Sequence, residues 1–155
     1  MSDKELLGLA IKIAGEGIVA GAGPFGAVIT MNGDIIASSG NRVVLDSDPT
    51  AHAEILAIRK AASVLNTHDL NGCILYASCE PCPMCLGAIY WAGIKKVVYS
   101  ASRHDAASAG FNDEFIYNEI DLNPSERKVT FIRVSDPEAG EVFRKWENFD
   151  DRIKY

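Results

Sequence analysis

The spacing of hydrophobic residues changes along the chain from helical to extended and back. In residues 4–20 apolar side chains recur three or four residues apart between Lys and Glu, which predicts an amphipathic helix that ends in the Gly-rich segment 21–24. Predicted strands at 25–30 and from 35 to about 44 flank Asn32-Gly33, a dipeptide typical of a tight hairpin turn. The first third of the chain therefore predicts a helix followed by a β-hairpin.

The rest of the chain alternates between predicted helices and strands, which favours a sheet with helices on both faces. The expected fold class is α/β, a three-layer α/β/α sandwich with a mixed five-stranded sheet. The further elements expected are a helix from about 52 to 62, a strand at 73–78, a helix at 82–93, a strand at 96–100, a loop at 101–112, a short helix from 112 or 113 to 120, a strand at 129–134 and a helix-like tail at 137–150.

Length and charge restrict the class of protein. A chain of 155 residues is expected to form a single domain with a proper core. Its apolar segments are too short to cross a bilayer, and its start lacks the basic region and cleavage site of a signal peptide, so we expect a cytoplasmic protein with no membrane partner. The net charge of −6 argues against a nucleic-acid partner, which would favour basic clusters.

Three of the four cysteines lie within residues 79–85, a spacing that suits a metal site better than a disulfide framework. Proline is favoured at the first helical position, so this segment predicts a helix start with Cys82 and Cys85 on one face of its first turn. The positive end of that helix would favour thiolates. Cys79, at the end of a predicted strand, and Cys73, inside it, are expected to pack in the interior.

A second segment supplies the remaining donor. His52-Ala53-Glu54 begins a predicted helix, with Asp48 or Thr50 as its cap, and His-x-Glu followed by Pro-Cys-x-x-Cys is a signature of zinc nucleobase deaminases. His52 can converge on the same ion as Cys82 only if it stands at the very start of that helix. A structural zinc site does not need Glu54, whereas a hydrolytic site needs a carboxylate to move the proton of a water molecule.

Simpler interpretations exist for the neighbouring polar residues. Glu54 alone could be a solvated helix residue, and Glu80 is expected to brace its loop. His68 and His104 lie in loop-like segments and are expected at the surface.

With these motifs in place, the chain resembles the cytidine-deaminase-like superfamily over nearly its full length and, within it, the bacterial guanine deaminases. The narrower resemblance rests on segments 79–92, 24–28, 48–54 and 109–113 and on Tyr155. It implies one Zn²⁺ per chain, held by His52, Cys82 and Cys85. It also implies that Glu54 transfers the protons as guanine is hydrolysed to xanthine and ammonia, a reaction of purine metabolism.

The resemblance also implies how the base is held. Phe25 matches a residue that packs on the purine ring, Asn41 one whose amide binds it, and Asp113 a carboxylate suited to the N1–H and amino donors of guanine. Asn41 could instead be a turn residue and Asp113 a helix cap. In these enzymes the C-terminal segment, here 149–155, crosses to the other subunit of a homodimer, where Tyr155 would reach the partner's ligand.

Three other functions remain compatible with the motifs. The first is a tRNA-adenosine deaminase, which needs basic surface for phosphates; from Asp136 onward the chain has six acidic and four basic residues. The second is a cytosine-type nucleobase deaminase. The third is not an enzyme but a zinc-stabilised binding module, in which Glu54 would be dispensable.

Overall fold

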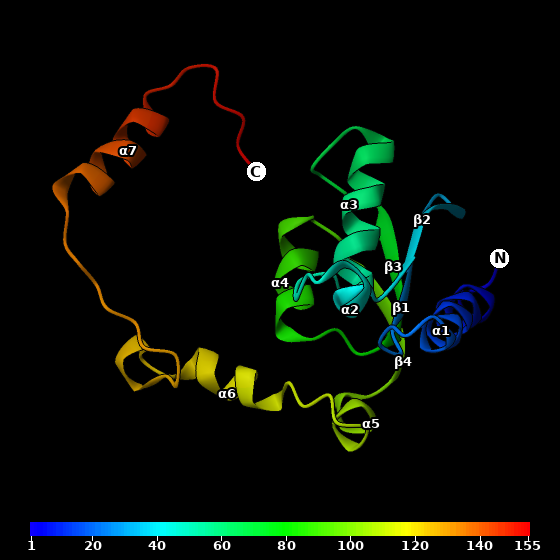
Figure 1. The fold of residues 1–155 in the computed structure, drawn as a ribbon. Helices are drawn as coiled ribbons and strands as arrows, with labels where there is room; N and C mark the ends of the chain where they lie inside the picture. Colours follow the sequence, from blue (N-terminus) through cyan, green and yellow to red (C-terminus); the bar gives the residue numbers. More distant parts are fainter. The chain divides into compact units, whose positions relative to one another are not determined.

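The computed structural model describes residues 1–155, which divide into two compact units, Met1–Phe115 and Ile116–Tyr155. The first unit holds a sheet and five helices, and the helix α6 crosses the boundary (Figure 1). The elements of the first unit are α1 (Asp3–Val19), β1 (Gly26–Met31), β2 (Asp34–Gly40), α2 (Val43–Asp46), α3 (Ala53–Leu65), β3 (Cys73–Cys79), α4 (Pro83–Trp91), β4 (Lys96–Ala101) and α5 (Arg103–Ser108). They are followed by α6 (Glu114–Asp121), the 3₁₀ turn η1 (Pro124–Glu126) and α7 (Pro137–Glu147).

The sheet has the strand order β2-β1-β3-β4. β1 pairs antiparallel with both β2 and β3, and β4 runs parallel to β3, so β2, β3 and β4 all point the same way. The predicted hairpin is confirmed: Asn32 and Gly33 have φ of 54° and 89°, the positive values that a tight hairpin turn requires. Because three strands share one direction, their carboxyl ends meet at one edge of the sheet.

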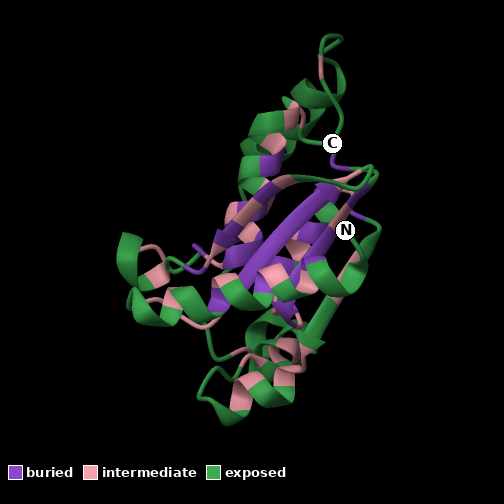
Figure 2. Ribbon diagram, turned by 90° about the vertical axis from the view of Figure 1, so that its right-hand side faces the viewer, coloured by how far each residue is buried: buried purple, intermediate pink, exposed green.

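Helices cover both faces of the sheet, as the alternation predicted. Successive side chains of a strand point to opposite faces, so β1 sends Ala27 and Ile29 to one side and Val28 to the other. Val28 packs with Leu6 and Ala10 of α1, whereas Ile29 belongs to the larger core that includes α3 and α4. The strands in the middle of the sheet are therefore buried on both faces (Figure 2).

The predicted fifth strand is wrong. Residues 129–134 form no strand, and the side chains of Val129, Ile132 and Val134 are exposed, so the sheet has four strands. A β-branched sequence favours a strand only where a neighbouring strand can pair with its backbone. Within the second unit this segment instead contacts Arg127, whose guanidinium lies 5.1 Å from the ring centroid of Phe131.

Two expectations about connecting segments also need correction. The second strand ends at Gly40, not near 44, because the short helix α2 follows at once. The segment 101–112, expected to be a loop, contains the helix α5. A capping box stabilises its start: the Ser102 hydroxyl accepts the Asp105 N–H, and the Asp105 carboxylate accepts the Ser102 N–H. No helix of the structure has both the length and the apolar character needed to span a bilayer.

The contact between α1 and β1 leaves no room for a side chain at Gly26. A Cβ there would overlap the carbonyl oxygen of Ala10 and lie 2.8 Å from the amide nitrogen of Ala14. Gly26→Ala should therefore lower the free energy of unfolding by about 2 kcal/mol or more, because neither backbone can yield without moving α1. Urea unfolding followed by circular dichroism measures the change.

The matched control is Gly8→Ala in α1, the helix that packs on Gly26; an added Cβ at Gly8 meets no atom within 4 Å. That substitution should be neutral or stabilising by up to about 1 kcal/mol, since alanine favours a helix over glycine. Equal unfolding midpoints for the two variants would contradict the close packing of α1 on β1.

Candidate active site

The start of β1 and the ends of β2, β3 and β4 lie at the same edge of the sheet. Gly26 at the start of β1 pairs with Gly40 at the end of β2, and Cys79 at the end of β3 pairs with Ala101 at the end of β4. The residues just beyond these positions therefore converge, although they lie far apart in the sequence. The carboxyl edge of strands in an α/β sheet is a common place for a ligand site.

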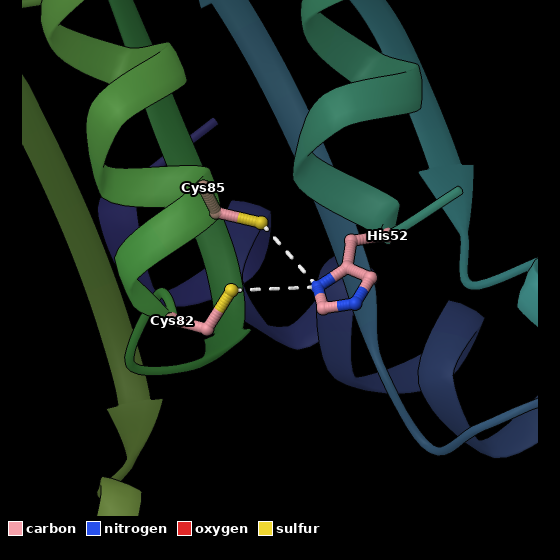
Figure 3. A group of neighbouring side chains, drawn as sticks. All are labelled: His52, Cys82 and Cys85. Atoms are coloured by element: carbon pink, nitrogen blue, oxygen red, sulfur yellow. Dashed lines mark hydrogen bonds between the residues drawn. The ribbon is translucent and has the colours of Figure 1, made fainter. Parts of the chain in front are cut away.

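Two helix starts bring three metal donors together at this edge. His52 is the N-cap of α3, and Cys82 is the N-cap of α4, followed by Pro83 at the first helical position. Cys85 lies in the first turn of α4 and is fully buried. The Nδ1 atom of His52 lies 3.5 Å from the Sγ atoms of both cysteines, and the three side chains point at one another (Figure 3).

The dimensions of this group fit zinc. Zn²⁺ in a tetrahedral site binds imidazole nitrogen at about 2.0–2.1 Å and thiolate sulfur at about 2.3 Å, which places nitrogen and sulfur about 3.5–3.6 Å apart. The His52 nitrogen stands at that separation from both sulfurs, and the three donor atoms lie within 4.8 Å of one another. Three protein donors are the number found in catalytic zinc sites, which keep a position for water or substrate.

The electrostatics of the three donors show that they act as one group. The hydrogen bond from Cys85 lowers the pKa of Cys82 to about 4, and the same contact raises the pKa of the Cys85 thiol above its ordinary value. The Cys82 sulfur in turn raises the pKa of His52. Because the three donors lie this close together, a divalent cation would compete with their protons and neutralise the thiolates.

Glu54 lies in the first turn of α3, two residues after His52, and is 7% exposed. Burial is the main cause that raises the pKa of its carboxyl above the ordinary value, while His52 acts in the opposite direction. The interpretation of Glu54 as a solvated helix residue is therefore wrong. A buried carboxylate with a raised pKa beside a metal group is suited to take up and return a proton.

A cavity of about 400 Å³ opens over this group, entirely within the first unit. Its wall includes Phe25, whose ring meets that of Phe111 edge to face, with centroids 5.0 Å apart and planes at 87°. The remaining lining residues are Gly23, Asn41, Val43, Val44, His52, Glu54, Cys79, Glu80, Cys82, Arg103, Ala106, Gly110, Asn112 and Asp113.

Three of the four residues predicted to bind the base line this cavity. Asn41 is buried, and its side-chain oxygen accepts the backbone N–H of Val43, so the residue also acts as the turn residue that was the alternative. Burial raises the pKa of Asp113 above its ordinary value, while the amide of Glu114 is capped by the Asn112 side chain. Tyr155 belongs to the second unit, so its contact with a base stays a prediction.

The other predicted positions agree with their structural interpretations. Cys73 and Cys79 are buried, and burial raises the pKa of the Cys79 thiol, which donates to the Ser102 carbonyl, to about 11. Cys79 lies outside the group of three donors. His68 and His104 are exposed. The predicted cap of α3 is wrong, because the Asp48 carboxylate accepts from the backbone and hydroxyl of Thr50 and the helix begins after them.

Several residues of the cavity wall were not predicted from the sequence, among them Val43, Val44, Arg103 and Phe111. Val43 and Val44 lie in α2, in a segment that was predicted to be the end of the second strand. Arg103 opens α5, and the Ser102–Asp105 capping pair was the available signal for that helix. Phe111 stands inside the 109–113 segment already singled out by resemblance.

Comparisons with known proteins agree with this geometry. Residues 1–101 match the family described as the cytidine and deoxycytidylate deaminase zinc-binding region. The chain is 53% identical to the guanine deaminase of Bacillus subtilis over 156 residues, covering all of both chains. It is 41% identical to the tRNA-specific adenosine deaminase of Aquifex aeolicus, over 79% of this chain and 81% of that protein.

A solved structure gives the same result for the fold. The X-ray structure of guanine deaminase from Bacillus subtilis superimposes with a TM-score of 0.97 at 52% identity, covering all of this chain and 99% of that one. The donor group and the family match together identify the cofactor as one Zn²⁺. The chain belongs to the zinc-binding family of cytidine and deoxycytidylate deaminases.

Proposed function

We propose that this protein is a guanine deaminase, which hydrolyses guanine to xanthine and ammonia. The observation that carries the proposal is the buried Glu54 beside a zinc-sized group of three donors, at the base of a cavity with aromatic and acidic walls. The full-length similarity to a guanine deaminase supports the choice of substrate among the heterocycles that this family deaminates.

The cavity wall offers groups that complement guanine. Phe25 and Phe111 present aromatic surface to a planar ring system. Asp113 can accept from the N1–H and the 2-amino group of guanine, two adjacent donors that adenine does not present. Asn41, held by its bond to Val43, supplies a fixed amide for a further hydrogen bond to the purine.

In the proposed reaction His52, Cys82 and Cys85 hold the zinc ion, and Glu54 moves the protons. Zinc, when bound there, supplies a Lewis acid that lowers the pKa of water. Glu54 takes a proton from the attacking water, whose oxygen forms a bond to C2, and gives that proton to N3 of the ring. It then passes the second proton of the water to the amino nitrogen, so that the C2–N bond breaks and ammonia leaves.

We further propose that residues 1–155 act as one deaminase domain within a homodimer. Residues 149–155 would cross to the other subunit, where Tyr155 would contact the base. The support is the resemblance to guanine deaminases and the exposed apolar side chains of this tail, with Phe149 54%, Ile153 69% and Tyr155 82% exposed. The four free cysteines support a location in the reducing cytoplasm.

A tRNA-adenosine deaminase is the second candidate, because a relative with that activity is 41% identical over most of this chain. Its substrate would need basic side chains along the phosphate backbone. The acidic excess after Asp136 and the net charge of −6 favour a small, uncharged base instead.

A screen of ammonia release separates the candidate substrates. Zinc-loaded protein should release ammonia from guanine much faster than from guanosine, adenine, cytosine, cytidine or a tRNA anticodon stem-loop, because only guanine offers Asp113 two donors without a bulky ribose. A coupled assay measures the ammonia. Release from the stem-loop alone would exclude the guanine assignment.

Replacing the proton carrier should stop the chemistry and leave the metal. Glu54→Gln should lower kcat by a factor of about 10² to 10⁴, because a neutral amide cannot take the proton of water. Zinc content, measured by atomic absorption, should remain near one per chain. Cys82→Ala is the contrasting variant and should lose zinc together with activity. A Glu54→Gln enzyme with nearly normal kcat would contradict the role given to Glu54.

Removing the tail tests the contribution of residues 149–155. The truncated protein should lose most of its kcat/KM for guanine and keep its zinc, because the tail would contact only the base. Mixing the truncated chain with a full-length Glu54→Gln chain should restore part of the activity, because in a mixed dimer the intact tail covers the intact site. Unchanged kcat/KM after truncation would remove the proposed contact.

A further inference from the structure

Glu80 and Arg103 form a pair in the cavity wall that the reaction described above does not use. The Glu80 Oε1 atom accepts from Nη2 of Arg103 at 2.8 Å and from Nε at 3.1 Å. The other carboxylate oxygen, Oε2, accepts the backbone N–H of Arg103 at 3.0 Å. Both oxygens and the forked face of the guanidinium are thus engaged, which fixes the relative orientation of the two residues.

The two residues belong to different functional segments of the site. Glu80 lies in the turn that leads from β3 to Cys82, and its backbone N–H is itself tied to the Ala101 carbonyl at 2.8 Å. Arg103 is the first residue of α5. The pair therefore joins the turn that carries a zinc donor to the first residue of the helix beside it.

The segment that follows α5 forms the part of the cavity wall that would face the base. The helix ends at Ser108 and the chain turns at Gly110, which has φ of +94°. The amide N–H of Phe111 donates to the Ala106 carbonyl at 2.9 Å. Phe111 then meets Phe25, and Asp113 follows two residues later. Because α5 is less than two turns long and Phe111 is tied back to Ala106, we expect a displacement of Arg103 to displace Phe111 and Asp113 as well.

We propose that Glu80 and Arg103 are a positioning pair that sets the distance between the zinc group and the part of the wall that binds the base. This inference rests on the proposed function. Phe111 and Asp113 follow the short helix α5, which is connected to β4. The Glu80–Arg103 pair fixes the start of that helix to the turn that carries Cys82. The pair acts through these residues and does not touch the reacting atoms.

The partial exposure of the pair agrees with this role. The side chains of Arg103 and Glu80 are 35% and 20% exposed, and ion pairs with that much access to water contribute little to the stability of a fold. The two guanidinium N–H groups that share Oε1 still restrict position, and lysine, a single point charge, cannot reproduce this fork. The expected consequence of breaking the pair is therefore a change in binding geometry more than a loss of folding.

The test is a kinetic comparison of Arg103→Met, Arg103→Lys and the milder Glu80→Gln with the wild-type enzyme, each with its zinc content measured. Arg103→Met should raise KM for guanine about tenfold and leave kcat within about threefold, since it removes binding that ground state and transition state share. The Kd of 8-azaguanine, measured by calorimetry, should rise by the same factor. Arg103→Lys and Glu80→Gln should fall between Arg103→Met and wild type.

The matched control is Lys96→Met. Lys96 pairs with Asp3 at 2.9 Å, with side chains about half exposed, and lies at the opposite end of β4. Lys96→Met should change Tm about as much as Arg103→Met does, and it should leave the KM for guanine unchanged. A purely structural role for Arg103 predicts the same outcome for both variants, so equal KM values in Arg103→Met and Lys96→Met would overturn the proposal.

Amide hydrogen exchange tests the inference without substrate. In Arg103→Met the amides of Gly110 and Phe111 should exchange about tenfold faster than in wild type, while amides of β3 keep their protection. If wild type fails to release ammonia from guanine, the proposed function fails and this measurement alone decides the positioning role. Unchanged exchange at Gly110 and Phe111 would reject it.

Discussion

The convergence of two helix starts on one cation is the constraint on which the rest of the site depends. His52 begins α3 and Cys82 begins α4, and neither helix contains all the donors. The sheet holds both helices against one face, so the donors meet only when the strands are paired. Two thiolates this close would repel each other without a cation, so binding of the metal and folding of this edge support each other.

The same edge also explains why the proton carrier is buried. Glu54 follows His52 by two residues, so a histidine placed at the N-cap puts the carboxylate in the first turn beside Cys85. Burial raises the pKa of the Glu54 carboxyl. Hydrogen bonds from the backbone and from Cys85, together with the charge of His52, partly offset the cost of burying this acid. Metal binding and proton transfer are therefore consequences of one helix start.

The remaining walls of the cavity come from connections between strands. α2 follows β2, and α5 follows β4, so each of these two strands is followed by a short helix that lines the cavity. Contacts such as Phe25 with Phe111 and Glu80 with Arg103 join these connections to one another. Connecting segments tolerate sequence change better than the strands they join, and this chain is similar both to a guanine deaminase and to a tRNA-specific adenosine deaminase.

The sequence by itself determined the local features. The turn at Asn32-Gly33, the proline that starts α4 and the donor spacing are set by backbone chemistry within a few residues, and they were predicted correctly. The tertiary structure decided what depends on distant partners. Residues 129–134 have strand composition but no paired strand, and Arg103 gains a role only because β3 and β4 end side by side. Pairing between strands and contact between connections are long-range interactions, and no local pattern of residues encodes them.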